Sequence, residues 1–227
     1  MSSRVGGAVG TTSISRTLSA NKLGVVKLKW EGGGTPASSI TGAINTWTLA
    51  GYSRHTSGNE PGLAWYYCLN TAAGAETFTP SFTGSGTFLH GEMEEWTSAT
   101  GAFALDGSPV FTNTGTGTGV GNTYNTSSGT ATGAGVAFYG VSDFNSLSTL
   151  TGGGTPAFAV GNGGAANGDS FLAYATVTGA GAVSPSIQCA GGATQFVTSL
   201  IIFKEVTAGA NLEDVLHRPA MMAILAQ

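Results

Sequence analysis

The sequence predicts an all-β protein: an antiparallel two-sheet jelly-roll sandwich with an extended N-terminal arm and a short C-terminal helix and tail. Two observations support this fold class. Short runs in which apolar and polar residues alternate recur along the chain, as expected for half-buried strands. Connectors rich in Gly, Asn, Ser and Thr separate these runs, which is typical of antiparallel all-β proteins. The 227 residues suffice for one such sandwich.

The alternation is clearest in LGVVKLKW, residues 23–30. Val26 and Trp30 share one side of this run, and Lys27 and Lys29 share the other. Because successive side chains of a strand point to opposite faces, the pattern predicts one buried and one solvated face. Further runs are expected to be strands for the same reason, with Pro80 marking an edge or bulged strand. These runs are 63–69, 77–82, 86–96, 135–141, 170–177 and 194–206.

The last of these runs is apolar on both faces from Leu200 to Phe203, which predicts a central position in a sheet. The Gly-Thr tract at 112–135 fits either a disordered loop or a polar strand pair. The sequence GGGTPA occurs at 32–37 and again at 152–157. The repetition is either chance in a Gly-rich chain or the same turn in two halves of a pseudo-symmetric sandwich.

The two ends of the chain differ from the middle. Residues 1–18 are polar and contain Gly, so we expect an arm, followed by the sandwich at 19–206. In the region 207–227, Asn211 is suited to cap a short helix that ends before Pro219. The apolar residues of this region are too numerous to remain in water, so we expect them to pack in an assembly. They are Leu212, Val215, Leu216, Met221, Met222, Ile224 and Leu225.

Composition excludes several classes of function. Charged residues make up 9% of the chain, against about 25% in an average soluble domain. Only eight residues are Lys or Arg, and they do not cluster, so we expect no nucleic-acid partner. No apolar stretch is long enough for a signal peptide or a membrane span, so we expect no membrane partner. A weakly charged surface suits a homo-oligomer or another assembly, because little repulsion separates the copies.

The acidic cluster in GEMEEW, residues 91–96, is the strongest candidate for chemistry. Glu92 and Glu94 would share a strand face, at a spacing that the two carboxylates of a glycosidase can use. The cluster resembles the Glu-x-Asp-x-x-Glu strand of jelly-roll glucanases, but its last acid, Glu95, falls on the opposite face and Trp96 follows. We therefore expect a strand with a solvated acidic face and no catalytic residues.

Other sites are weaker. His55, His90 and His217 are isolated, and no metal-ligand spacing surrounds them, so we expect neither a metal nor a cofactor. Cys68 and Cys189 fit small buried hydrophobes, with a disulfide as the alternative. Five aromatic residues could form a sugar-stacking platform, although the spacing of Trp47 and Trp65 favours the core. The five are Trp47, Tyr52, Trp65, Tyr66 and Tyr124.

Two segments resemble a known family. Tyr66, Tyr67, Asn70, Ala73 and Gly74 form one element, and the second consists of Glu95, Trp96, Thr97 and Asp106. Over roughly residues 15–206, this arrangement resembles the small jelly-roll sandwich domains of tailed-phage virion proteins and bacterial surface proteins. The family has no catalytic signature, so the resemblance implies a structural role.

The resemblance places the chain in a virion. The expected function is that of a non-enzymatic structural protein, a phage capsid decoration (cement) protein that binds the major capsid protein. The alternatives are a head-fibre or tail subunit, or a carbohydrate-binding β-sandwich module that recognises a host-surface glycan.

Overall fold

The computed structural model describes residues 1–55, 61–114, 122–125, 127–143, 148–161, 170–190 and 195–207. These residues form strands and no helix, and every strand pairing among them is antiparallel. The all-β, antiparallel prediction is therefore confirmed. The helix and apolar tail expected at 207–227 lie outside the described residues beyond Thr207.

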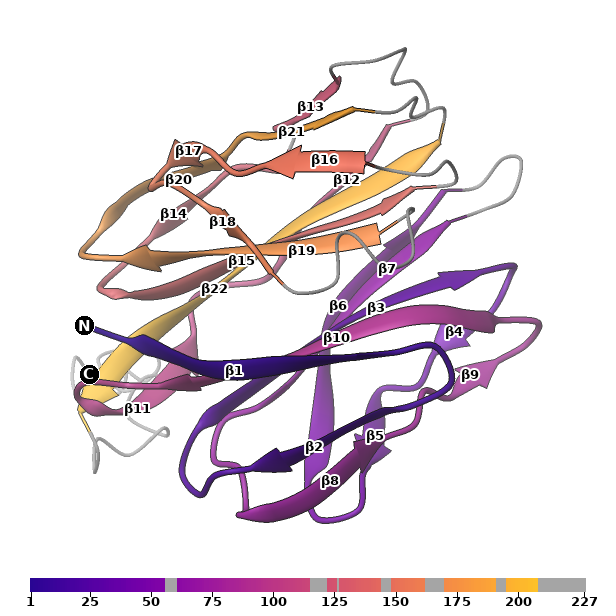
Figure 1. Ribbon diagram of the computed structural model, residues 1–227, viewed down its shortest axis with the longest axis horizontal. Coiled ribbons are helices and arrows are strands. Elements are labelled where there is room, and N and C mark those ends of the chain that lie inside the picture. The colour runs from indigo at the N-terminus through magenta and orange to yellow at the C-terminus, as the bar shows by residue number, and fades with distance from the viewer. Residues whose placement is uncertain are drawn as a thin grey trace, which may run out of the picture.

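Two six-stranded sheets form the centre of the molecule (Figure 1). Sheet I comes from the first half of the chain and has the order β1 (Ser3–Gly10), β10 (Thr87–Thr97), β3 (Leu23–Glu31), β7 (Gly62–Cys68), β6 (Thr46–Arg54), β5 (Ser39–Thr41). Sheet II comes from the second half and has the order β11 (Gly101–Leu105), β22 (Phe196–Thr207), β15 (Gly135–Asp143), β19 (Ser170–Val177), β18 (Ala159–Val160). Strand β12 (Val110–Thr114) also pairs with β22, so β22 is central, as its sequence predicted.

Small sheets cover the outer face of each large sheet (Figure 1). On sheet I they are β2 (Ile14–Leu18) with β8 (Gly74–Phe78), and β4 (Thr35–Pro36) with β9 (Phe82–Thr83). On sheet II they are β13 (Asn122–Tyr124), β21 (Ile187–Ala190) and β16 (Ser148–Thr151), and β14 (Gly129–Ala131), β20 (Gly181–Pro185) and β17 (Gly154–Thr155).

Three apolar clusters hold these layers together. The central core lies between the large sheets and includes Trp65 and Trp96 of sheet I and Phe138 and Phe203 of sheet II. The ring of Phe138 packs edge-on against Trp96, with ring centroids 5.8 Å apart. An outer core joins each large sheet to its small sheets. The strand predicted at residues 63–69 is confirmed, and its alternate side chains enter the central core and the first outer core.

The two halves of the chain share one plan. The order β1-β10-β3-β7-β6 of sheet I recurs as β11-β22-β15-β19-β18 in sheet II. In each sheet the central strand pairs on both sides: Lys27 of β3 pairs with Glu92 and Trp65. In sheet II, Phe138 of β15 pairs with Ile201 and Tyr174. The two GGGTPA segments lie at matching places, between β3 and β6 and between β15 and β18, which favours the pseudo-symmetric interpretation of the repetition.

The structure differs from three sequence expectations. Residues 1–18 are not an arm outside the sandwich, because β1 is a strand of sheet I and Ile14 and Leu18 are buried in the first outer core. The run 77–82 is not one strand, since β8 ends at Phe78 and β9 begins at Phe82. Lys27 and Lys29 are fully buried, because the face of sheet I expected in solvent is covered by sheet II.

Removal of an aromatic ring from the central core, where the two halves of the chain meet, should lower the free energy of unfolding. Phe138→Ala should lower the free energy of unfolding by about 3–5 kcal/mol, because a buried ring is replaced by a cavity. The control Val110→Ala, at a side chain 39% exposed, should change it by less than about 0.5 kcal/mol. Urea unfolding followed by tryptophan fluorescence measures both values. A loss below about 1 kcal/mol in Phe138→Ala, close to the effect of a surface substitution, would contradict the role of the central core.

Candidate functional site

Several charged side chains are buried inside the protein, and four of them, Lys27, Lys29, Glu92 and Glu94, form a charged layer between the two large sheets. Fifteen of the twenty charged residues lie in the described part of the chain, and seven of these fifteen are buried. The seven are Lys27, Lys29, Glu76, Glu92, Glu94, Glu95 and Asp143. Burying a charge costs free energy unless the charge has a partner, so each of these side chains is expected to have one.

Lys27 and Glu92 form the centre of this charged layer. They are cross-strand neighbours on β3 and β10, and the Nζ of Lys27 lies 2.7 Å from Oε1 of Glu92. Lys27 Nζ also donates a hydrogen bond to Oγ of Ser170, on β19 of sheet II. The pair therefore links the two sheets. Lys29 makes a second link, since its Nζ donates to the carbonyl oxygen of Asp143 at 2.7 Å.

Glu94 lies two residues further along β10 and has a different cation. Arg4 of β1 donates from Nε and Nη2 to the two carboxylate oxygens of Glu94, at 2.6 and 2.8 Å. Such fork-to-fork pairs fix both side chains in one geometry. Burial raises the pKa of the Glu94 carboxyl, and the hydrogen bond from Arg4 opposes this increase. The guanidinium also lies over the ring of Tyr174, 5.3 Å from its centroid, so Arg4 too connects the two sheets.

Glu95 projects from the other face of β10, as the alternation predicted. Its Oε1 accepts a hydrogen bond of 2.6 Å from the backbone N–H of Ser19, and its Oε2 lies 3.3 Å from Nη2 of Arg16. Glu95 thus fixes the chain that leaves β2. Glu76 acts similarly without a cation, because it accepts bonds from the backbone of Ala43 and from the side chain of Asn45.

The solvated acidic face expected for β10 is therefore wrong. Glu92 and Glu94 are each 1% exposed, because the side of sheet I that carries them is covered by sheet II. The two carboxylates share a strand face, but each is held by its own cation and neither meets solvent. A glycosidase needs both carboxyl groups on either side of a bound sugar, so this pair lacks the access that such chemistry requires.

The contact of Lys27 with Ser170 resembles a Ser–Lys pair, in which the serine can act as nucleophile and the lysine as base. Two features argue against that chemistry here. The Nζ of Lys27 is already engaged, because it lies 2.7 Å from Oε1 of Glu92 and donates to the hydroxyl of Ser170. The hydroxyl of Ser170 donates its proton to the carbonyl oxygen of Val141 at 3.0 Å and is 1% exposed. The arrangement is that of a structural hydrogen-bond network.

His90 is the one histidine of this layer, and sequence reasoning did not place it there. It is fully buried, and neither ring nitrogen has a hydrogen-bond partner. Its Nδ1 lies 4.0 Å from Oε1 of Glu92. Burial, together with the charges of Lys27 and Lys29, lowers the pKa of His90 to about 3, so the ring is neutral at pH 7. The alternation of His90 with Glu92 and Glu94 along β10 was the available signal.

The aromatic residues proposed for sugar stacking are not on the surface. Trp47, Trp65 and Tyr66 are fully buried, and Tyr124 is 1% exposed. Only Tyr52, at 43%, is accessible. A stacking platform needs several exposed rings, so this group cannot form one. Their core-facing spacing in the sequence had already favoured this outcome.

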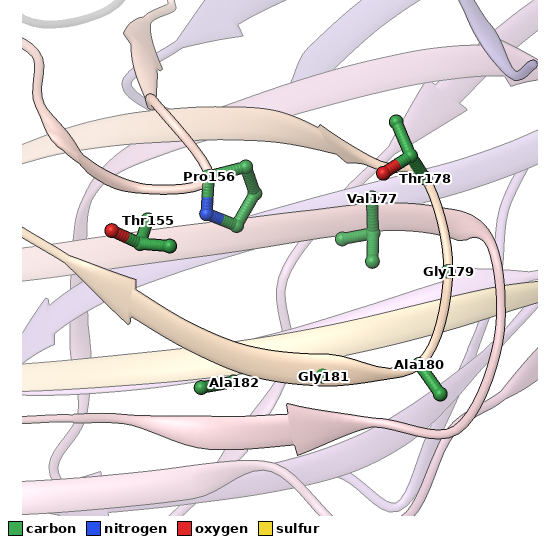
Figure 2. Close-up of a pocket in the computed structure, with 8 residues that line it drawn as sticks. All are labelled: Thr155, Pro156, Val177, Thr178, Gly179, Ala180, Gly181 and Ala182. Atoms are coloured by element: carbon green, nitrogen blue, oxygen red, sulfur yellow. The ribbon is translucent and has the colours of Figure 1, made fainter.

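A pocket of about 210 Å³ lies over the turn between β19 and β20 (Figure 2). Pro156 lies on one side of it, and Gly179 and Ala180 of the turn lie on the other. Its volume is below the range of roughly 300–1,000 Å³ typical of small-molecule sites. None of the lining residues is charged, so no acid, base or metal ligand faces the pocket.

Metal and thiol chemistry have little support in the described residues. No group of three or more His, Cys, Asp or Glu side chains there is arranged to hold a metal ion. Cys68 is a free cysteine, and burial raises the pKa of its thiol, which lowers its reactivity. It packs against the first outer core, as expected for a small hydrophobe. The side chain of Cys189 lies outside the described residues.

Comparison with protein families, curated proteins and solved structures finds no match for this chain. In the described part of the chain, no helix has the length and apolar character needed to cross a membrane. The site must therefore be interpreted from its own geometry.

The charged layer predicts a strong coupling between Lys27 and Glu92. Lys27→Met and Glu92→Leu should each lower the free energy of unfolding by about 3–5 kcal/mol, because each leaves a buried charge without its partner. The double variant should lose less than either single variant, since no unpaired charge remains. A double-mutant cycle measured by urea unfolding tests this, and additive losses would show that the pair is not coupled.

His90 predicts a specific dependence of stability on pH. The folded-state pKa of His90, about 3, lies below the ordinary histidine value of 6.5, so below about pH 6.5 the unfolded chain binds a proton that the folded chain does not. The stability that neutral His90 contributes is present above pH 6.5 and is lost as the pH falls towards 3. The expected slope is about 1.4 kcal/mol per pH unit.

His90→Leu should remove that slope, which urea unfolding between pH 7 and pH 4 measures. Glu94 acts in the opposite direction, because its raised pKa favours the folded state as the pH falls. Comparing the variant with the natural chain isolates His90 from this contribution. Equal slopes in the two proteins would show that His90 is accessible to protons in the folded state.

Proposed function

We propose that the chain is a non-enzymatic structural protein of a virus particle, and specifically a phage capsid decoration protein. The observation that carries the non-enzymatic part is the buried charged layer. Lys27 and Lys29 of β3 donate to sheet II, and Glu92 and Glu94 of β10 hold Lys27 and Arg4, the cations that contact sheet II. Together with an uncharged pocket of about 210 Å³, this supports a role in which surface contact, and not catalysis, is the function.

The virion setting rests on the resemblance of the sequence to jelly-roll domains of phage virion proteins. The strand order supports a jelly-roll connection within each half of the chain. In the first half, the order β1-β10-β3-β7 faces the pair β2–β8 across the first outer core. In the second half, the order β11-β22-β15-β19 faces the pair β14–β20. We propose that the chain is a tandem of two such units, each with few external charges.

A decoration protein also needs surfaces that bind the shell and its own copies. The apolar residues of the C-terminal region, from Leu212 to Leu225, are the proposed assembly segment. The partners are further copies of the chain and the major capsid protein, and the location is the virion. A head-fibre or tail subunit would use the same features at a lower copy number.

Quantitative peptide mass spectrometry of purified particles tests this function. A decoration protein should be present in hundreds of copies that scale with the major shell protein, because every shell position offers the same site. A few to tens of copies would indicate a fibre or tail subunit instead. Absence of the chain from particles would contradict the virion proposal altogether.

A further inference from the structure

Strand β1 presents an apolar edge. Six large apolar side chains are exposed in the described part of the chain, and three of them are among its first nine residues. These three are Met1 at 78%, Val5 at 43% and Val9 at 42%. Strand β1 is the last strand of sheet I, and no described strand pairs with its outer side.

The usual protection of an edge strand is incomplete here. Proteins protect such edges with charges, prolines or bulges. The segment from Val5 to Gly10 contains neither a charged residue nor Pro, and Arg4 is engaged by Glu94. A bulge between Arg4 and Gly6 interrupts the start of the strand. From Gly6 to Gly10, however, the pairing with β10 is regular, so this stretch offers an ordered edge to a further strand, although the carbonyl oxygen of Gly7 already accepts a hydrogen bond from Arg16 of β2 at 3.0 Å.

We propose that this edge receives residues 220–226, AMMAILA, from the tail of a neighbouring copy. The segment has no charge, and its Met, Ile and Leu side chains match the exposed valines in character. An extended peptide that adds to a sheet edge gains main-chain hydrogen bonds and buries alternate side chains. The inference deepens the proposed assembly role and rests on it for the presence of neighbouring copies.

The position of the tail favours a neighbour over the chain's own edge. Thr207, the last described residue, pairs with Gly101, and Thr100 Oγ1 donates to the carbonyl oxygen of Val206 at 2.9 Å. Thr97, just before this turn, pairs with Ser3 at the start of β1. The tail therefore leaves sheet II close to the beginning of β1.

The directions of β22 and β1 also favour a neighbouring copy. Strand β22 runs towards this end of the molecule, and β1 runs away from it. A tail that kept the direction of β22 would leave its own sheet, and it would have to reverse to lie along its own β1. In two copies related by a twofold axis at this end, each tail would instead run onto the partner's β1. The twelve linking residues 208–219 can span up to about 40 Å.

Charge placed on the edge tests the docking surface in the full chain. Val9→Lys should weaken self-association, measured by analytical ultracentrifugation, by about tenfold or more, because an ammonium group would face the apolar segment. The matched control is Ile44→Lys, at a side chain 42% exposed in the turn before β6, and it should have no effect. Deleting residues 208–227 should weaken association as much as Val9→Lys, and combining the two should add nothing. Equal effects of the two lysine variants would overturn the proposal.

Cross-linking identifies the occupant. Val9→Cys is combined with Ile224→Cys, and separately with Met222→Cys, in a chain carrying Cys68→Ala and Cys189→Ala. Oxidation should produce links between chains in at least one combination, seen as multimers on non-reducing gels. Links only within one chain, or none in either combination, would overturn the proposal. Neither result affects the copy number in particles, so failure of this docking is distinguishable from failure of the virion role.

Discussion

The buried ion pair between Lys27 and Glu92 is the constraint on which the packing of the two halves depends. Both side chains project from sheet I towards sheet II, where water is excluded. Their charges remain tolerable only because they meet each other and because Ser170 of sheet II accepts a further bond from Lys27. Gly140 of β15 leaves the space for the stem of Lys27, since a Cβ at that position would lie 3.1 Å from the lysine Cδ.

The same constraint explains the rest of the charged layer. Once one face of sheet I carries Lys27, Lys29, Glu92 and Glu94, that face is stable only beneath a second sheet that supplies polar partners. The backbone of Asp143 and the ring of Tyr174 complete this set. The apolar part of the interface, around Trp65 and Phe138, contributes the hydrophobic stabilisation. The apolar part of the interface stabilises the packing of the two sheets, and the charged part fixes their relative orientation.

Periodicity predicted the long strands β3, β7, β10, β15, β19 and β22, because a strand shows its alternation whatever covers it. The central position of β22 followed from its apolar character on both faces. Burial of Lys27 and Glu92 could not be predicted, since the sequence of one strand does not show that a second sheet will enclose its polar side. Arg4 and Ser170 were missed as partners because they are 90 and 143 residues away from the side chains that they bind. The role of residues 1–18 was missed because a polar, Gly-containing edge strand has the composition of an arm.

The shared plan of the two halves has a consequence for how the chain folds. Two similar units in one polypeptide, or in neighbouring nascent chains, can exchange partners and form mispaired products. Here the two facing surfaces differ: sheet I presents Lys27 and Glu92 to the interface, whereas sheet II presents Phe138 and Ile201. Two copies of sheet I face to face would leave Lys27 and Lys29 without the Ser170 hydroxyl and the Asp143 carbonyl oxygen that accept their hydrogen bonds. This difference therefore selects the heterotypic pairing and discourages the mispaired alternative.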